Sequence, residues 1–412
     1  MPAFSGKFQY LDAAGAALQQ GACELSFDTE TGVVTRAGGV PLAFDLGDVD
    51  VYSPAEWELT LGLFTGKRFV LRQFGAAFGR VSEELLKAWR NRTVRCLLLE
   101  DLEEVAHFSG TANGAASEIR IYGSNLAVLP LGRTAMQWRL AEVDSVAFDD
   151  ASYTFTLQSG GDQLRIAKLG QKTEEFGEKL RATLGKLRQR EAEVLHLLFP
   201  FLDPDQLQQL VMLAPEGRSV KLTALAGIHR DLPEALIARA VDEPLRPYFQ
   251  SLRKRTAPGG LMTGFKFVRK DEVGAGPGEE AAGEETSGSE ASGVANDTGQ
   301  PLFFWFFFPM AGRNVAAWEA TSGSGRATYF FRTGTAVEES IGRLTRGLAL
   351  VNFRREPVYL SDTVLEQKAE FHRYAIGRRK LPELAELRAA FLGRAIHSSV
   401  EAWEKQVAEA GG

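Results

Sequence analysis

The chain has 412 residues, of which 44% are hydrophobic and 24% are charged, and its formal net charge at pH 7 is −6. This length exceeds what one hydrophobic core normally serves, so we expect two to three domains with an ordinary globular composition. The negative net charge argues against a protein devoted to nucleic-acid binding, because such domains are strongly basic.

The cysteines and the apolar segments narrow the class further. Cys23 and Cys96 are too few for a disulfide scaffold and fit a reducing compartment. The N-terminus lacks the basic segment followed by an apolar one that marks a signal peptide. The most apolar run, residues 302–310, has nine residues, whereas a membrane-spanning helix needs about 20. We therefore expect a cytoplasmic protein without a transmembrane segment.

A repeat organises the first half of the chain. Residues 44–50 and 138–144 have apolar residues at the same positions when they are aligned at an offset of 94. The further pairs at this offset are Leu25 with Ile119, Phe27 with Ile121, Val34 with Val128, Leu59 with Tyr153, Leu61 with Phe155 and Leu63 with Leu157. After a turn the offset becomes 95, which pairs Phe69 with Leu164, Leu71 with Ile166 and Gly75 with Gly170. A hairpin turn tolerates one inserted residue, so we interpret the pattern as a duplicated unit.

Each copy has the same predicted elements in the same order. In the first copy, residues 57–63 alternate between apolar and polar side chains, which is typical of a half-buried strand. A turn at 65–67 leads into a return strand at 69–71. An apolar residue at every third or fourth position from Phe78 to Trp89 then predicts an amphipathic helix. The second copy has the strands 153–157 and 164–166 and a helix with the stripe Phe176, Leu180, Leu184 and Leu187.

This order of elements resembles the pleckstrin-homology-like (PH-like) superfold, a bent small barrel capped by one C-terminal helix. The resemblance covers residues 1–195 as two copies. It implies seven strands per copy, of which the sequence predicts six, and a role in binding phosphoinositides, peptides or proteins. Lipid-binding members carry a basic motif in the first hairpin. The matching segments here, 28–36 and 123–126, lack a Lys/Arg cluster, so we do not expect a lipid headgroup in the usual pocket.

The middle of the chain changes to a helical pattern. Asp203 followed by Pro204 predicts an N-cap and the first residue of a helix. Residues 231–234 begin another helix, which Pro244 and Pro247 end. Residues 196–261 are therefore predicted to be a helical linker or subdomain.

Two oppositely charged stretches follow each other. Residues 246–270 contain seven Lys or Arg and no acid, and residues 271–300 contain eight acids and no Lys or Arg. We predict that the acidic segment is disordered, because it has too little apolar surface to offset the entropy of ordering. It could neutralise the basic stretch or compete for whatever that stretch binds.

Strand patterns return after the acidic segment. Residues 302–308 form an unbroken apolar run, which suits a strand buried on both faces. Residues 315–321 and 327–332 predict a hairpin around the turn 322–325. A helical stripe follows Gly334, as in the first two copies, so we interpret residues 262–352 as a third copy with an inserted acidic segment. Chance similarity is the alternative. Two helices are predicted near 363–376 and 382–408.

The predicted fold class is therefore α+β, with repeated small antiparallel β-barrel or sandwich units, each capped by a C-terminal helix, plus helical middle and C-terminal segments. The predicted domains are PH-like units at 1–98 and 99–195, a helical linker at 196–261, a third strand-rich unit at 262–352 with the insert 271–300, and C-terminal helices at 353–412.

No pattern in the sequence indicates catalysis. The five histidines show no metal-binding or triad spacing, and phosphate-binding glycine motifs are absent. Glutamate pairs at 83–84, 174–175 and 338–339 lie near the starts of predicted helices, where they complement the helix dipole. We therefore expect a protein that is not an enzyme and that needs neither a cofactor nor a metal.

The sequence favours a docking or scaffold protein that binds a protein or peptide partner through its tandem units, at exposed strand edges or in the groove beside the cap helix. The alternative is an anionic ligand, either nucleic acid or a membrane surface, bound by basic residues and autoinhibited by the acidic linker. The candidate binding residues are Arg253, Lys254, Arg255, Lys266, Arg269, Lys270, Arg378, Arg379 and Lys380. The partner and the oligomeric state are not predicted.

Overall fold

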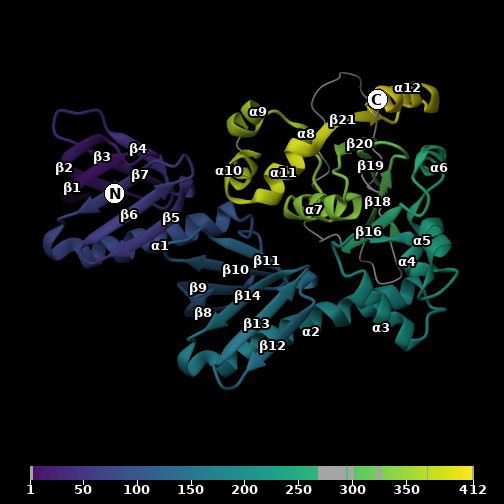
Figure 1. Cartoon of the computed structure of the whole chain (residues 1–412), viewed down its shortest axis with the longest axis horizontal. Helices are drawn as coiled ribbons and strands as arrows, with labels where there is room; N and C mark the ends of the chain where they lie inside the picture. The colour runs from purple at the N-terminus through teal and green to yellow at the C-terminus, as the bar shows by residue number, and fades with distance from the viewer. Residues whose placement is uncertain (1–2, 268–293, 296–300, 322–325, 369, 411–412) are drawn as a thin grey trace. The chain divides into compact units, whose positions relative to one another are not determined.

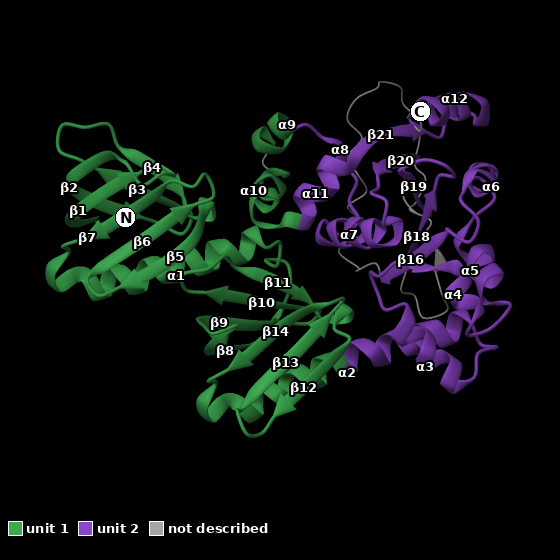
Figure 2. Ribbon diagram, in the orientation of Figure 1, with its two compact units in different colours: residues 1–184, 362–382 green, residues 185–361, 383–412 purple. Residues whose placement is uncertain are grey.

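The computed structural model describes residues 3–267, 294–295, 301–321, 326–368 and 370–410 (Figure 1). They divide into two compact units. Unit 1 comprises Met1–Leu184 with Asp362–Pro382, and unit 2 comprises Gly185–Ser361 with Glu383–Gly412 (Figure 2). Arg269, Lys270 and most of the predicted disordered segment, residues 271–293 and 296–300, lie outside the described residues, as does the predicted turn 322–325.

Unit 1 contains two curled antiparallel sheets, each of seven strands within the described residues 3–184. The first sheet consists of β1 (Ala3–Leu11), β2 (Ala17–Phe27), β3 (Thr31–Thr35), β4 (Leu42–Asp45), β5 (Val49–Ala55), β6 (Glu58–Leu63) and β7 (Arg68–Arg72). The second sheet consists of β8 (Glu104–Ala112), β9 (Ala115–Tyr122), β10 (Asn125–Pro130), β11 (Met136–Arg139), β12 (Ser145–Asp149), β13 (Thr154–Ser159) and β14 (Asp162–Ala167). In both sheets the first strand of the copy pairs with the seventh, so the two sheets have the same strand order.

A helix follows each sheet, as the sequence predicts. Helix α1 (Phe78–Cys96) buries Val81, Leu85 and Trp89 in the core of the first sheet. Helix α2 (Thr173–Leu198) follows β14, and its Phe176 lies with its ring centre 5.0 Å from that of Phe155 in the second sheet. These apolar stripes explain why both segments are helical, because each one covers an apolar sheet face.

The strand pairing confirms most of the predicted repeat. Leu25 pairs with Val34 in the first sheet, as Ile119 pairs with Val128 in the second. The connections from the last strand to the helix also match. Gln73 and Lys168 have positive φ angles of 61° and 56°, and Gly75 and Gly170 have φ angles of 57° and 60°.

The predicted register of one strand is wrong. Leu59 pairs with Leu71, and Phe155 pairs with Ile166. Because Leu71 and Ile166 are equivalent positions, Leu59 corresponds to Phe155 rather than to Tyr153. The turn before this strand is two residues longer in the second copy. The alternation of apolar and polar residues cannot reveal this insertion, because a shift of two residues keeps every side chain on the same face of the sheet.

The segment Asp362–Pro382 packs on unit 1. It contains α9 (Asp362–Gln367) and α10 (His372–Lys380), which replace the single helix predicted near 363–376. Arg379 Nη1 lies 2.7 Å from Asp48 Oδ1, and Lys380 Nζ donates a hydrogen bond of 2.8 Å to Val49 O. This part of the chain therefore completes unit 1 from a distant place in the sequence.

The helices of unit 2 in this part of the chain are α3 (Pro204–Leu213), α4 (Leu222–Ala226), α5 (Leu232–Ala240) and α6 (Arg246–Arg255). Helices α3 and α5 begin where the sequence predicts, whereas Pro247 lies at the start of α6 rather than at the end of a helix. Asp203 caps α3 as predicted, since its carboxylate accepts the Gln206 N–H while the Gln206 side chain accepts the Asp203 N–H. This reciprocal pairing satisfies two backbone N–H donors at the start of the helix.

The sheet of unit 2 has another strand order. Its strands are β15 (Val220–Lys221), β16 (Met262–Phe267), β17 (Val294–Ala295), β18 (Pro301–Pro309), β19 (Val315–Ala320), β20 (Ala327–Arg332) and β21 (Phe391–Ile396). Strands β15, β16, β18, β19, β20 and β21 are neighbours in chain order, and β17 pairs with β18. The predicted disordered segment thus contains a short strand. The sheet also extends beyond residues 262–352, because its last strand is β21.

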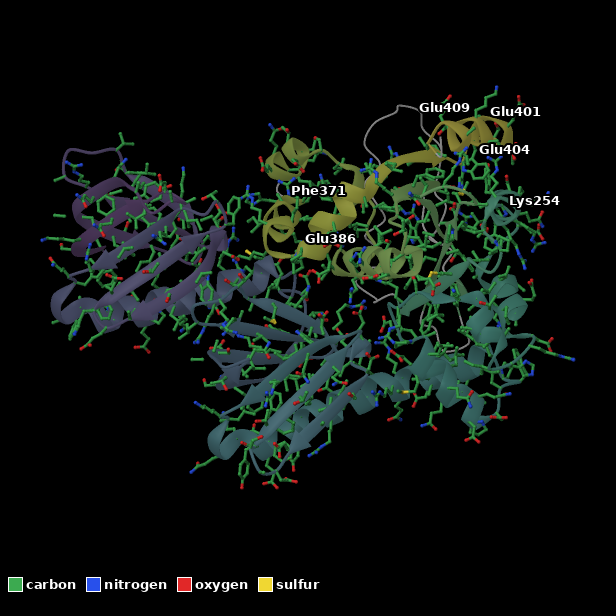
Figure 3. The ribbon with its side chains drawn as sticks, viewed as in Figure 1. Lys254, Phe371, Glu386, Glu401, Glu404 and Glu409 are labelled. Atoms are coloured by element: carbon green, nitrogen blue, oxygen red, sulfur yellow. The ribbon has the colours of Figure 1, made fainter. Side chains whose placement is uncertain are left out.

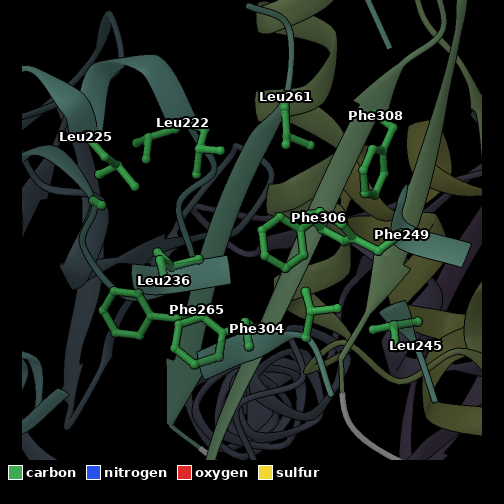
Figure 4. Packing of buried hydrophobic residues seen from close by; sticks show 14 of the residues in the cluster. Leu222, Leu225, Leu236, Leu245, Phe249, Leu261, Phe265, Phe304, Phe306 and Phe308 are labelled. Atoms are coloured by element: carbon green, nitrogen blue, oxygen red, sulfur yellow. The ribbon is translucent and has the colours of Figure 1, made fainter. Parts of the chain in front are cut away.

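The run 302–308 is buried on both faces, as predicted. Phe304, Phe306 and Phe308 lie in one core cluster with Phe249 of α6 (Figure 4). On the other face Trp305 stacks on Phe353 at a ring-centre distance of 4.1 Å. The remaining helices of this region are α7 (Val337–Leu350) and α8 (Glu356–Tyr359).

The single helix predicted over 382–408 is wrong. The segment forms α11 (Pro382–Ala390), β21 and α12 (Val400–Ala410), and β21 pairs with β20. Helical spacing in the sequence is overridden here by pairing with the edge of a sheet, which satisfies the backbone of both strands.

Candidate functional site

The nine predicted binding cations are divided between the two units. Unit 2 holds Arg253, Lys254, Arg255 and Lys266, unit 1 holds Arg378, Arg379 and Lys380, and Arg269 and Lys270 lie outside the described residues.

In unit 2 the basic stretch is largely neutralised. Arg253 Nη2 lies 2.7 Å from Glu234 Oε1, and Arg255 Nη2 lies 3.6 Å from Glu404 Oε1. Lys266 is buried in β16 and contacts the side chain of Asn352. Lys254 is exposed on α6 (Figure 3) and has no hydrogen-bond or ion-pair partner in the described part of the chain. The stretch contains no acid of its own, yet distant carboxylates supply the partners.

In unit 1 the three cations hold α9 and α10 in place. Arg378 pairs with Asp362, and Arg379 pairs with Asp48 and Glu366. Lys380 is 5% exposed, and its burial lowers the pKa of its ammonium group. These side chains therefore face other parts of unit 1.

A different surface of unit 1 is open. Strand β12 ends the second sheet, and among the described residues it pairs with β13 alone. Four of its five residues are exposed, including Phe148, which is 37% exposed. The Phe148 ring lies 4.5 Å from that of Phe155 and 6.5 Å from that of the exposed Tyr153. We call residues 145–149 together with Tyr153 the β12 edge.

The equivalent edge of the first sheet is occupied. The loop between β10 and β11 lies along β5, where Gly132 N donates a hydrogen bond of 2.8 Å to Tyr52 O. Thr134 Oγ1 donates one of 3.0 Å to Asp50 Oδ2, and Leu131 packs against the first core. Gly132 has a φ of 72°, a conformation that glycine adopts without strain. The first sheet therefore shows what this kind of edge can hold.

The pairing registers identify the matching residues of the two edges. Tyr52 pairs with Leu61, and Val146 pairs with Leu157. Leu61 and Leu157 are equivalent, because they pair with Phe69 and Leu164, which match in the repeat. Val146 thus takes the place of Tyr52, and Asp144 that of Asp50. The β12 edge presents the equivalent backbone acceptor, Val146 O, and no loop of the described residues pairs with it, whereas the Asp144 carboxylate accepts a hydrogen bond of 2.8 Å from Gly160 N.

The sequence predicts docking at an exposed strand edge or in the groove beside a cap helix, but it does not single out the β12 edge, because it does not show which edge is covered by another part of the chain. A usable signal exists in residues 131–134, Leu-Gly-Arg-Thr, which correspond to Ala-Gly-Gly-Val at 37–40. The second loop thus has a large apolar side chain at Leu131 and a hydroxyl at Thr134, where the first loop has Ala37 and Val40. This difference marks the loop that binds an edge.

One polar cluster in unit 2 assembles residues that are far apart in the sequence. Thr328 Oγ1 donates a hydrogen bond of 2.6 Å to Glu319 Oε2, and Trp403 Nε1 donates one of 2.9 Å to Thr328 Oγ1. His397 Nε2 lies 3.4 Å from Glu319 Oε2, and Tyr248 stacks on the imidazole at 4.1 Å. The side chains of Glu319 and His397 are 1% and 4% exposed. A substrate has no access to such a cluster, so we interpret it as structural.

The described residues contain no group of three or more His, Cys, Asp or Glu that could hold a metal ion. None of their helices combines the length and apolar character needed to cross a membrane. No protein-family model matches the sequence, and no curated protein matches it significantly.

Proposed function

We propose that this chain is a docking protein whose β12 edge receives a segment of a protein partner. One observation carries this proposal. The β5 edge of the first copy holds residues 131–134, while no other described strand or loop pairs with the equivalent β12 edge. A partner would donate a backbone N–H to Val146 O and place apolar side chains against Phe148 and Tyr153. An unpaired strand edge is a template for such added backbone hydrogen bonds.

The resemblance to the PH-like superfold supports a binding role. Seven strands per copy, pairing of the first strand with the seventh, and a following helix are similar to that superfold. The first copy serves as a support in this proposal, because its β5 edge is covered by the loop 131–134. Its short helix Leu46–Asp48 is also contacted, since Arg379 of α10 pairs with Asp48.

The anionic-ligand alternative has less support. Four of the seven candidate cations in the described residues pair with a carboxylate, and Lys266 and Lys380 are buried. The carboxylate-paired cations are Arg253, Arg255, Arg378 and Arg379. Tight binding of a labelled oligonucleotide that weakens steeply with added salt would favour this alternative.

The test of the docking proposal uses the loop that the first copy already holds. The probe is a fluorescent peptide of residues 128–136, VLPLGRTAM, and its binding to the full chain is measured by anisotropy. Phe148→Asp should weaken binding by about tenfold or more, because it removes apolar contact area and adds a charge at the edge. The matched control is Val105→Asp, since Val105 is 41% exposed on β8 of the same sheet. Equal binding by both variants, or no binding by the unaltered chain, would overturn the proposal.

A further inference from the structure

A pocket of about 330 Å³ opens on the surface of unit 2. It lies between α4, the start of α5, the end of α6 and the loop that follows α6. Leu222, Ala226, Pro233 and Leu261 contribute apolar atoms to its lining. Its volume is at the lower end of the range of small-molecule sites, which is about 300–1,000 Å³. The pocket therefore suits a small ligand with an apolar part.

An ion pair forms the polar part of the lining. Arg253 Nη2 lies 2.7 Å from Glu234 Oε1, and the two side chains are 48% and 66% exposed. The pair uses one nitrogen of Arg253 and one oxygen of Glu234. Within the described residues, the other guanidinium nitrogens and Glu234 Oε2 have no hydrogen-bond partner. The wall thus presents cationic donors and an anionic acceptor side by side, while the pair stays intact.

Two hydroxyl groups complete the lining. Thr256 Oγ1 donates a hydrogen bond of 2.8 Å to Leu252 O, which leaves its lone pairs able to accept. Thr223 is exposed, and its hydroxyl has no hydrogen-bond partner among the described residues. Both groups can therefore bind a charged ligand group beside the ion pair.

We propose that this pocket binds a free amino acid with an apolar side chain. The α-carboxylate would bind the free nitrogens of Arg253, the α-ammonium group would bind Glu234 Oε2, and the side chain would lie against Leu222, Pro233 and Leu261. The lining favours a ligand that has both a positive and a negative group, because Glu234 would repel a simple anion and Arg253 would repel a simple cation. The proposal is independent of docking at the β12 edge.

The ligand test uses calorimetric titration of the full chain with L-leucine. Three analogues each lack one feature: N-acetyl-leucine lacks the ammonium group, leucinamide lacks the carboxylate, and glycine lacks the side chain. We expect leucine to bind and each analogue to bind about tenfold more weakly or worse, because each loses a charge-assisted hydrogen bond or its apolar contact. Equal binding of N-acetyl-leucine would overturn the proposal in favour of a simple anion site, and absence of leucine binding at millimolar concentration would overturn it outright.

Variants of two residues in the pocket lining test whether leucine binds in this pocket. Arg253→Gln and Glu234→Gln should each weaken leucine binding by about tenfold, because each removes one charged partner. Arg246→Gln is the matched control, since Arg246 lies on the same helix, outside the pocket lining, and pairs with Glu243 at 2.6 Å. Unchanged leucine binding in the Arg253 and Glu234 variants, or an equal loss in the control, would overturn the assignment.

Discussion

Replacing Thr328 with valine tests how strongly the buried polar cluster holds unit 2 together. Thr328 is fully buried on β20, and its hydroxyl bonds both Glu319 and Trp403. Valine has nearly the same shape, so it removes these hydrogen bonds without leaving a large cavity. Glu319 Oε2 and Trp403 Nε1 then lose a partner in a site without solvent access. Each buried unsatisfied group costs about 1–3 kcal/mol, so we expect Thr328→Val, which leaves two such groups, to lower the unfolding free energy by about 2–6 kcal/mol.

Urea unfolding followed by tryptophan fluorescence measures this change. Thr223→Val is the control, because Thr223 is exposed and should alter stability by less than about 0.5 kcal/mol. The double variant Glu319→Leu with Thr328→Val should lose less than Thr328→Val alone, because it no longer buries an unpaired carboxylate. A loss below about 1 kcal/mol for Thr328→Val would refute the reasoning.

Three further predictions concern burial, helix packing and the covered edge. Burial raises the pKa of the Cys96 thiol from 9.0 to about 12. Between pH values equal to these two pKa values, the thiol is deprotonated in the unfolded chain and protonated in the folded chain. The unfolding free energy should therefore fall by about 1.4 kcal/mol for each pH unit in this range. Urea unfolding at pH 8 and at pH 10 should show a smaller loss of unfolding free energy for Cys96→Ala than for the unaltered chain. A Cβ on Gly347 would lie 2.6 Å from Glu383 O, so Gly347→Ala should destabilise by about 1–3 kcal/mol in thermal unfolding. Gly342→Ala on the same helix meets no atom within 4 Å and should stabilise by about 0.5–1 kcal/mol. Leu131→Asp should release the β5 edge and raise the number of peptides bound per chain in calorimetry, and an unchanged number would contradict the assigned role of the loop.

The sequence predicts the repeated sheets and their helices well, because those elements depend on local patterns. The apolar stripe from Phe78 to Trp89 and the alternation in 57–63 are each visible in a short stretch of sequence. The structure contains the corresponding helix α1 and strand β6. The match of Gly75 with Gly170 likewise follows from a backbone conformation that favours glycine.

The missed features depend on contacts between distant parts of the chain. Strand β21 forms because β20 offers an edge, and no local pattern reveals that edge. The acids that neutralise Arg253 and Arg379 are Glu234 and Asp48, which are remote in sequence from the cations they bind. A run of Lys and Arg residues in the sequence therefore predicts a more basic surface than the folded chain has.

The sequence predicts the type of candidate site, an exposed strand edge, but not its location. Exposed strand edges follow from an antiparallel meander, but the sequence does not say which edge is covered. That distinction depends on the hydrogen bond between Gly132 N and Tyr52 O, which joins the two copies. The repeat then identifies Val146 as the corresponding uncovered acceptor, so the structure and the sequence are both needed.

The most direct test of the docking account is site-specific photo-crosslinking from the β12 edge in cells that produce the protein. A photoreactive amino acid replaces the exposed Ala147 of β12 in one version of the full chain and the exposed Val105 of β8 in another. The account predicts a discrete crosslinked protein from position 147 that disappears when Phe148→Asp is added, and no such product from position 105. The same products from both positions, or none from position 147, would contradict it.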